Sequence, residues 1–240
     1  MEQNLMQPWH VCVLIPARDE EDLVSRCLLS VLEAKRGLGS LATVDIVMVV
    51  DNSTDRTLEL ARALIKRHGT VLQANAGSVG TARCLAARLA LARYNGALNR
   101  CWLANTDADS VVPLDWLTRQ VKFADQGVQV IAGTVNVDNF AEHGPDVPQR
   151  FRHSYEIASD GSHGHVHGAN FGVRADIYVR AGGWGHLPTA EDHDLWRRLR
   201  ALNAVTRSTN SVEVITSGRR QGRAPHGFAD ALAAHNEARP

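Results

Sequence analysis

Apolar runs and amphipathic stretches alternate along the first half of the chain. Four short apolar runs have the length and the polar boundaries of buried strands, and they occupy residues 10–15, 44–50, 70–73 and 101–106. The stretches that follow residues 22, 55 and 78 carry apolar residues at helical spacing. Strands that alternate with helices predict βαβ units, and therefore an α/β fold with a mostly parallel sheet.

The second half predicts further elements of both kinds. They are a helix from Pro113 to Gly127, a strand over 128–137 with a break at Gly133, a polar loop over 138–147, helices over 150–159 and 175–181, a helix that starts near Thr189, and one or two strands within 204–216. Residues 163–167 read as a strand with alternate side chains on one face. Gly69 is expected to close the helix before it.

Three of the predicted strands end in polar clusters, at residues 18–20, at 51–54, and at Asp107 with Asp109. Ligands of open α/β sheets bind outside the carboxyl ends of the strands, so these clusters are expected to meet. Asp107 and Asp109 repel each other unless a cation lies between them, and a hard divalent cation brings substrate phosphates with it. The hypothesis is a Mg²⁺ or Mn²⁺ that holds a nucleotide diphosphate. The alternative is a turn and helix cap before Pro113.

Two further segments have both a structural and a functional interpretation. The glycine-rich residues 75–83 lack the spacing of dinucleotide-binding loops and P-loops. They form either an ordinary strand-to-helix turn or a loop that approaches a nucleotide with Arg83 towards its phosphates. His163, His165 and His167 resemble a metal-binding trio, but a polar face that lines a substrate cleft is the favoured interpretation.

Charged residues near the end of the chain suggest a general base and a flap. Acidic residues at 191, 192 and 194 open a predicted helix. They suit the helix dipole there, and a carboxylate beside a cleft is also a candidate general base. The basic, glycine-rich residues 217–228 form either a solvated tail or a mobile flap whose arginines meet a diphosphate. Such a flap brings His226 towards the metal.

Composition narrows the class of protein. The chain has 240 residues, 44% of them hydrophobic, and equal numbers of basic and acidic residues, 26 of each. This length and composition fit one domain, or one domain with a trailing segment. Balanced charge argues against a nucleic-acid partner, and no apolar run is long enough for a transmembrane segment. Scattered cysteines and the absence of a signal peptide predict free thiols, no cysteine zinc site and a cytoplasmic location.

The order of these motifs resembles that of the family 2 glycosyltransferases. The matching segments are residues 15–21, 50–57, 75–83, 107–109, 168–170 and 191–194, and with looser matches they extend from about residue 10 to 226. The resemblance implies the GT-A fold, a Rossmann-like mixed sheet flanked by helices, as a single domain over 1–216. It implies a nucleotide-binding half over about 10–110 and an acceptor half over about 111–216, followed by a flexible basic segment over 217–240. It also implies metal-dependent transfer of a sugar, with inversion, from a UDP- or GDP-sugar donor to an acceptor hydroxyl.

The resemblance also assigns roles to single residues. The residues expected to bind the nucleotide are Pro16, Ala17, Arg18, Glu20, Asp51, Arg83 and Asp107. Asp109 is the expected metal ligand, His226 joins it through the looser match of the C-terminal segment, and Asp192 is the expected catalytic base. The residues expected to position donor or acceptor are Gly168, Ala169, Asn170, Glu191, Arg219 and Arg220. Asn52 stands where the family usually has a second acid. The site that recognises the nucleobase therefore has one negative charge fewer than is usual in the family.

The sequence is also compatible with other classes of protein. A nucleotidyltransferase of similar architecture usually has a glycine-rich loop after the first strand, and residues 16–20 contain no glycine. A non-catalytic module that binds nucleotide sugars or glycans would bind a donor without turnover. A retaining glycosyltransferase would not use Asp192 as a base. The sequence leaves open a small-molecule, lipid-linked or glycan acceptor, peripheral membrane contact and a homodimer.

Overall fold

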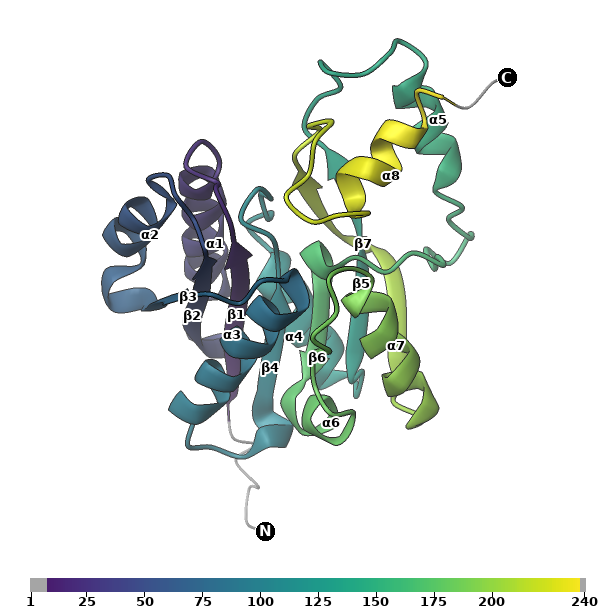
Figure 1. Cartoon of the computed structure of the whole chain (residues 1–240). Helices are drawn as coiled ribbons and strands as arrows, with labels where there is room; N and C mark the ends of the chain where they lie inside the picture. The colour runs from purple at the N-terminus through teal and green to yellow at the C-terminus, as the bar shows by residue number, and fades with distance from the viewer. Residues whose placement is uncertain (1–7, 238–240) are drawn as a thin grey trace.

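Seven strands form one sheet in the computed structural model, which describes residues 8–237 (Figure 1). The strands are β1 (Trp9–Ala17), β2 (Ala42–Asp51), β3 (Gly69–Ala74), β4 (Cys101–Asn105), β5 (Val130–Val137), β6 (Phe171–Arg174) and β7 (Thr206–Thr216). Their order is β3-β2-β1-β4-β6-β5-β7. All neighbours are parallel except β6, which runs antiparallel to β4 and β5. The predicted mixed, mostly parallel sheet is confirmed.

Helices cover both faces of the sheet. One layer contains α1 (Val24–Leu38), α2 (Thr57–Ile65) and α4 (Trp116–Asp125), and the other contains α3 (Val79–Arg93), α6 (Ala175–Arg180) and α7 (Glu191–Ala201). Alternate residues of β1 belong to the two layers: Val13 packs with the first and Leu14 with the second. Burial on both faces explains why β1 reads as a continuous apolar run.

A smaller apolar cluster lies beyond the ends of β5 and β7. It joins α5 (Val147–Ser154) to α8 (Phe228–Ala234) through buried Phe151 and Leu232. Figure 1 shows α8, in yellow, beside α5. No sequence pattern predicted α8. The helix predicted over 150–159 instead begins at Val147, with a proline in its first turn. The chain after β7 therefore returns to the domain.

Gly69 does not close a helix, contrary to the sequence prediction. α2 ends at Ile65, a 3₁₀ turn over Lys66–His68 follows, and Gly69 is the first residue of β3. A Cβ at position 69 would lie 1.8 Å from the backbone oxygen of Ile46 on β2. Glycine is needed here because two strands approach each other closely, not because a helix ends.

The predicted break at Gly133 is confirmed. The register of β5 against β7 shifts between Gly133 and Thr134. The side-chain amide of Asn170 fills the irregularity, donating to Thr134 O at 2.8 Å and to Val212 O at 2.9 Å. A Cβ at Gly133 would lie 2.2 Å from Asn170 Nδ2. The buried amide therefore ties the two strands together where their ladder is interrupted.

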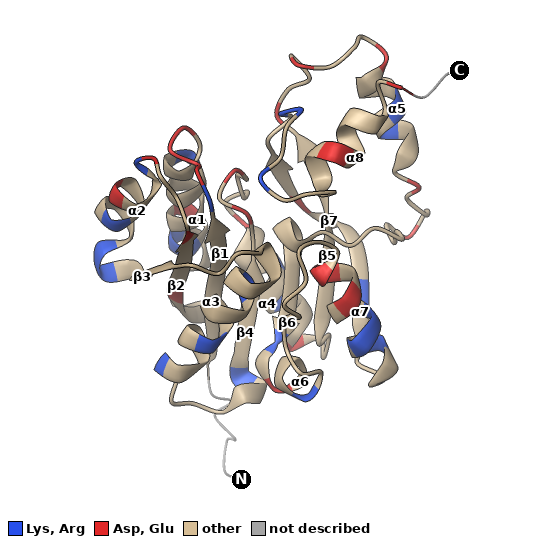
Figure 2. Cartoon of the chain, in the orientation of Figure 1, with Lys and Arg blue, Asp and Glu red and all other residues tan. Residues whose placement is uncertain are grey.

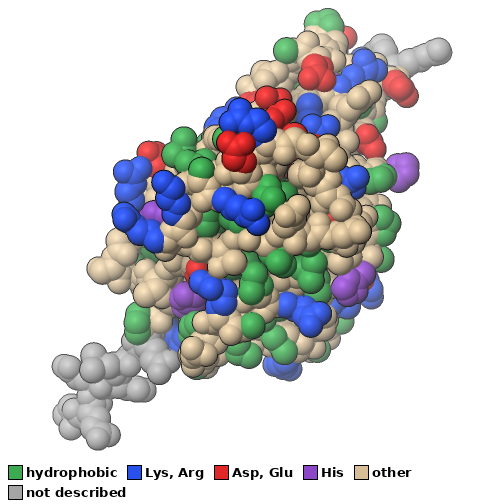
Figure 3. All heavy atoms as spheres, turned by 60° about the vertical axis from the view of Figure 1, so that its left-hand side comes forward, with side chains coloured by type: hydrophobic (Ala, Val, Ile, Leu, Met, Phe, Trp, Pro, Cys, Tyr) green, Lys and Arg blue, Asp and Glu red, His purple; other side chains and the backbone are tan. Residues whose placement is uncertain are grey.

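The charged surface is mixed. Figure 3 shows basic and acidic side chains on the same face, some of them directly beside each other. The four cysteines are free thiols. Within residues 8–237, no helix combines the length and the apolar character needed to cross a bilayer.

Candidate active site

A cavity of about 900 Å³ opens at the carboxyl ends of β1, β2 and β4, under the segment that follows β7. The three strand-end clusters lie together in its wall, which includes Asp51, Asp107 and Asp109. Of the site residues expected from the sequence, the lining contains Pro16, Ala17, Arg18, Glu20, Asp51, Arg83, Asp107, Asp109, Gly168, Ala169, Glu191, Asp192, Arg219 and His226. It does not contain Asn170, whose amide lies between β5 and β7, or Arg220, whose backbone N–H donates to Glu142 Oε2 at 2.9 Å.

The loop after β1 is held by the loop after β2. Asp19 N–H donates to Ser53 Oγ at 3.0 Å, and Glu20 N–H donates to Thr57 Oγ1 at 2.7 Å. In return, Thr54 N–H donates to Asp19 Oδ1 at 2.8 Å. Backbone N–H groups that bond to side chains on a neighbouring loop fix both loops at once. This interlock places the Glu20 carboxyl in the cavity wall.

Asp51 stabilises the glycine-rich loop. Its Oδ1 accepts from Ala76 N–H at 2.6 Å and from Gly77 N–H at 3.2 Å. Gly77 has φ +74°, a conformation that favours glycine. Ser78 then caps α3 by accepting from Thr81 N–H at 3.2 Å. The loop is thus a strand-to-helix turn whose backbone donors are used by a buried acid, and it still borders the cavity.

Arg83 lies beneath the cavity, with 2% of its surface exposed. Its Nη2 donates to Asp107 Oδ1 at 2.6 Å and its Nε donates to Glu191 Oε1 at 3.1 Å. Burial opposes its charge, but Asp107 and Glu191 outweigh that effect and raise the pKa of Arg83. A Cβ at Gly168 would lie 2.4 Å from Arg83 Nη2, so the guanidinium occupies the space that glycine leaves. Arg83 therefore joins the end of β4 to the start of α7.

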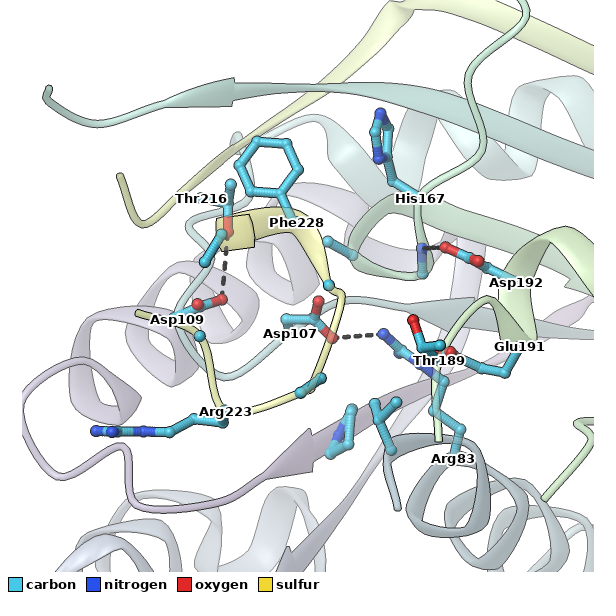
Figure 4. A pocket seen from close by; sticks show the side chains of 18 of the residues that line it. Arg83, Asp107, Asp109, His167, Thr189, Glu191, Asp192, Thr216, Arg223 and Phe228 are labelled. Carbon is cyan, nitrogen blue, oxygen red and sulfur yellow. Dashed lines mark hydrogen bonds and ion pairs between the residues drawn. The ribbon is translucent and has the colours of Figure 1, made fainter. Parts of the chain in front are cut away.

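A second arginine neutralises the acids on the other side of the cavity. Arg219 donates to Asp109 Oδ2 at 2.6 Å and holds Glu20 with two bonds of 2.9 and 2.5 Å. Thr216 Oγ1 donates to Asp109 Oδ1 at 3.2 Å, a contact that Figure 4 shows. Burial raises the pKa of Glu20 to about 7, and burial together with Asp107 raises the pKa of Asp109. Glu20 and Asp109 therefore need a positively charged partner in order to stay ionised.

Asp192 lies across the cavity from Asp109 (Figure 4). Gly168 N–H donates to Asp192 Oδ2 at 2.8 Å, and His193 N–H donates to its Oδ1 at 2.7 Å. The acidic first turn of α7 is visible in red in Figure 2. The backbone enters this turn through Ala190, which has φ +56°. Fixed N–H donors orient the carboxylate without neutralising it.

The segment after β7 crosses the cavity mouth. Arg223 Nη2 donates to Asp19 O at 2.8 Å, and Thr189 Oγ1 donates to His226 O at 3.2 Å. His226 N–H donates to Asp230 Oδ2 at 2.7 Å, at the start of α8. These bonds link the segment to loops on both sides of the cavity, where the sequence analysis expected a tail or flap.

The three alternate histidines do not lie on a strand, because residues 163–167 form no regular element. Within residues 8–237, no group of three or more His, Cys, Asp or Glu side chains could hold a metal ion, so the trio reading is excluded. Their rings nevertheless lie side by side: His165 and His167 are parallel within 6°, with centroids 5.9 Å apart. The expected polar face lining a cleft is found for two of the three: His165 and His167 line the cavity, whereas His163 lines a separate pocket with Ser208.

His167 makes stability depend on pH. Burial lowers its pKa from 6.5 to about 3, so the unfolded chain binds a proton between these values that the folded chain does not. Acidification from about pH 7.5 to about pH 5 should therefore cost about 2 kcal/mol of unfolding free energy through this group. Urea unfolding of His167→Gln at both pH values should show a smaller loss than the parent. His153→Gln, on the exposed end of α5, is the control and should keep the full loss.

Three residues of the site were missed from the sequence. Thr216 contacts Asp109 because the loop after β4 bridges to the end of β7, where Val111 pairs with Ile215. Tyr155, at the end of α5, and Phe228, in α8, contact the histidines. Each depends on a long-range contact. Thr216 could have been found from the rule that ligands bind at the carboxyl ends of strands. No such rule applies to Tyr155 or Phe228.

The mixed sheet with an acidic cavity at its strand ends is the GT-A architecture, the class that the fold and the site define together. The chain belongs to glycosyl transferase family 2, because residues 12–180 match the model of that family. The matched part includes the strand ends that carry Asp51, Asp107 and Asp109.

Solved structures share this fold. The mannosyltransferase PcManGT from Pyrobaculum calidifontis, in complex with GDP-Man and Mn²⁺, superposes with a TM-score of 0.63 at 19% identity, covering 96% of this chain and 70% of that one. TarS 1–349 from S. aureus, in complex with UDP-GlcNAc, gives 0.63 at 18% identity, covering 90% of this chain and 60% of that one. At these identities the likeness concerns the fold.

A curated relative is similar in sequence over half of this chain. The undecaprenyl-phosphate 4-deoxy-4-formamido-L-arabinose transferase of Edwardsiella ictaluri (strain 93-146) is 30% identical over 128 residues. The match covers 53% of this chain and 37% of the relative. The aligned part is thus a minor share of the relative's length.

Proposed function

We propose that this protein is a metal-dependent glycosyltransferase that moves a sugar from a UDP- or GDP-sugar to an acceptor hydroxyl with inversion. The observation that carries the proposal is one cavity with Asp109 at one side and Asp192 at the other, in a family 2 chain. The neighbours PcManGT and TarS were solved with GDP-Man and UDP-GlcNAc, which supports a nucleotide-sugar donor.

The acidic side of the cavity fits a divalent cation. Asp107 and Asp109 offer carboxylate oxygens, and the buried Asp109 already takes a positive partner in Arg219. Mg²⁺ is usually held by one or two carboxylates together with substrate phosphates and water, so a protein-only cage is not required. Asp109 would hold the ion, with His226 as a second candidate from the C-terminal segment. A bound ion would supply positive charge to the leaving diphosphate.

The chain's own residues divide the remaining tasks. Pro16, Ala17, Arg18, Glu20 and Asp51 would surround the base and ribose. Arg83 keeps Asp107 in place from below. Asp192, oriented by Gly168 N–H, would take the proton from the acceptor hydroxyl as that oxygen attacks the anomeric carbon. Attack opposite the leaving diphosphate inverts the anomeric configuration.

We also propose that residues 217–240 act as a cover that closes on the donor, while 1–216 carry the chemistry. The bonds of Arg219 and Arg223 to the first loop support this division. The free cysteines are consistent with the proposed reducing cytoplasm.

Arg219→Gln tests the cation site directly. Mn²⁺ titration of the nucleotide-free protein should show binding tightened by about tenfold, because a guanidinium no longer occupies Asp109 and Glu20. Arg26→Gln is the matched control, since Arg26 pairs with Asp138 at 2.9 Å outside the cavity lining. Unchanged or weaker Mn²⁺ binding in Arg219→Gln would remove Asp109 as a ligand.

The function is tested with UDP-glucose and GDP-mannose, each with and without Mn²⁺. We expect metal-dependent release of a nucleoside diphosphate, and the anomeric proton of the product should show inversion by NMR. Pyrophosphate release from a nucleoside triphosphate and a sugar phosphate would establish the nucleotidyltransferase instead. If the donor binds but is neither transferred to an acceptor nor hydrolysed by water, the protein is a non-catalytic binding module. Retention at the anomeric carbon would remove the role of Asp192 as a base.

A further inference from the structure

Stacked rings border the cavity beside Asp192. Tyr155 and His165 stack with centroids 4.2 Å apart, and His167 lies parallel to His165. Phe228 of α8 meets His167 edge-on at 5.9 Å. His165, His167 and Phe228 line the cavity, and Figure 4 shows the latter two along its upper edge. These four residues are called the ring wall below.

Hydrogen bonds favour one tautomer of His167. The Tyr155 hydroxyl accepts from Val135 N–H at 3.3 Å and lies 2.7 Å from His167 Nε2. Donation to Nε2 gives the hydroxyl proton a partner, whereas accepting from Nε2 as well would leave that proton without one, so we assign the hydroxyl as the donor. The neutral ring of His167 then carries its own proton on Nδ1. Among residues 8–237, no hydrogen-bond partner is found for Nδ1. A neutral N–H donor is therefore available to a molecule in the cavity.

Two rings of the ring wall, His167 and Tyr155, carry no charge near neutral pH. Burial lowers the pKa of His167 and raises that of Tyr155, so both rings are neutral. Four arginines line the cavity: Arg83 and Arg219 are engaged by acids, Arg223 bonds to Asp19 O, and Arg18 belongs to the loop after β1. A phosphate at the ring wall would lose its water without gaining a cation. An uncharged molecule with a flat C–H face and hydroxyl groups fits this wall better.

We propose that the ring wall is the acceptor subsite and that the acceptor is an uncharged sugar ring. This inference rests on the proposed glycosyl transfer and names the acceptor class for it. The sugar packs its C–H face against the rings, and one of its oxygens accepts from His167 Nδ1–H. The next residue, Gly168, donates to Asp192 Oδ2 at 2.8 Å, so the subsite and the base share one short segment.

The transfer balances with these groups. The acceptor oxygen forms a bond to the anomeric carbon of the donor, and the bond from that carbon to the diphosphate oxygen breaks. The hydroxyl proton moves to the Asp192 carboxylate, and the electron pair of the broken bond leaves with the diphosphate.

The experiment uses the full chain with methyl β-D-glucopyranoside and methyl α-D-mannopyranoside as probes, and a short polyprenyl phosphate as the rival acceptor. Saturation-transfer NMR detects binding without turnover, and product formation gives kcat and KM for each probe. We expect at least one glycoside to bind and to be glycosylated. His165→Ala and Tyr155→Phe should each raise its KM by about fivefold, with a smaller change in kcat, because one removes a ring contact and the other releases the tautomer lock.

His10→Ala is the matched control. His10 also stacks on a tyrosine, Tyr94, with centroids 4.7 Å apart, but it lies outside the cavity lining. Its KM for the glycoside should equal that of the parent. Circular dichroism of each variant separates a local change from loss of the fold.

Two outcomes overturn the inference. Either neither glycoside binds while the polyprenyl phosphate saturates the enzyme, or a glycoside binds with a KM that His165→Ala and Tyr155→Phe leave unchanged. Failure of the proposed function looks different, because the protein would then neither bind nor hydrolyse any nucleotide sugar. Saturation-transfer NMR measures glycoside binding whether or not the protein binds or hydrolyses a nucleotide sugar.

Discussion

Asp192→Asn should lower kcat for glycosyl transfer by about 10²–10⁴-fold, the usual contribution of a positioned base. The amide keeps a similar shape and can still accept from Gly168 N–H, but it cannot take the acceptor proton. Binding of a nucleoside diphosphate with Mn²⁺ should remain, which thermal shift measures. A ligand at about 100 times its Kd adds about 2.7 kcal/mol of stability.

Asp194→Asn is the control for this experiment. Asp194 lies in the same first turn of α7, but it pairs with Arg197 and Arg198 at 2.8 Å and is absent from the cavity lining. Turnover of Asp194→Asn should stay close to that of the parent. Full turnover in Asp192→Asn would exclude that residue as the base and would favour a retaining mechanism.

Arg83→Met should cost about 3–5 kcal/mol of unfolding free energy, because Asp107 and Glu191 would lose the buried cation between them. Methionine roughly fills the volume of the aliphatic stem, so the loss reports charge more than packing. Urea unfolding followed by circular dichroism measures it.

Arg93→Met provides the comparison on the same helix. Arg93 pairs with Asp45 at 2.8 Å, but 45% of its side chain is exposed, so its removal should cost less than about 1 kcal/mol. Equal losses in the two variants would mean that Arg83 contributes no more than a surface ion pair.

The placement of the acids could be read from the sequence because it follows from a general rule. Asp51, Asp107 and Asp109 each follow an apolar run, and parallel strands present their carboxyl ends at one edge of the sheet. The pairing of Arg219 with Glu20 could not be read in the same way. These residues are 199 positions apart, and no local pattern specifies their contact.

Other predictions failed because one residue type serves several purposes. Gly69 was taken for a helix terminator, yet it permits β2 and β3 to approach each other. Asn170 was expected to position donor or acceptor, yet its amide lies outside the cavity lining and satisfies backbone groups at the shift between β5 and β7. The alternate histidines suggested a strand, whereas ring stacking holds them in an irregular segment. In each case a tertiary contact decided what the local pattern could not.

The interlocked loops after β1 and β2 bear on how the choice of nucleobase could be altered. Asp19, Ser53 and Thr57 hold the frame, whereas the exposed Asn52 bonds to the end of β3 and the loop after it. Its N–H donates to Ala74 O at 3.0 Å and its Nδ2 donates to Asn75 Oδ1 at 2.6 Å. Its backbone already has φ +49°, which aspartate tolerates as well as asparagine. Under the proposed function, Asn52→Asp would supply the family's second acid while leaving Asp19, Ser53 and Thr57 in place, at the loss of the bond that Asn52 Nδ2 donates to Asn75. This position is therefore a starting point for testing a preference between uridine and guanosine donors.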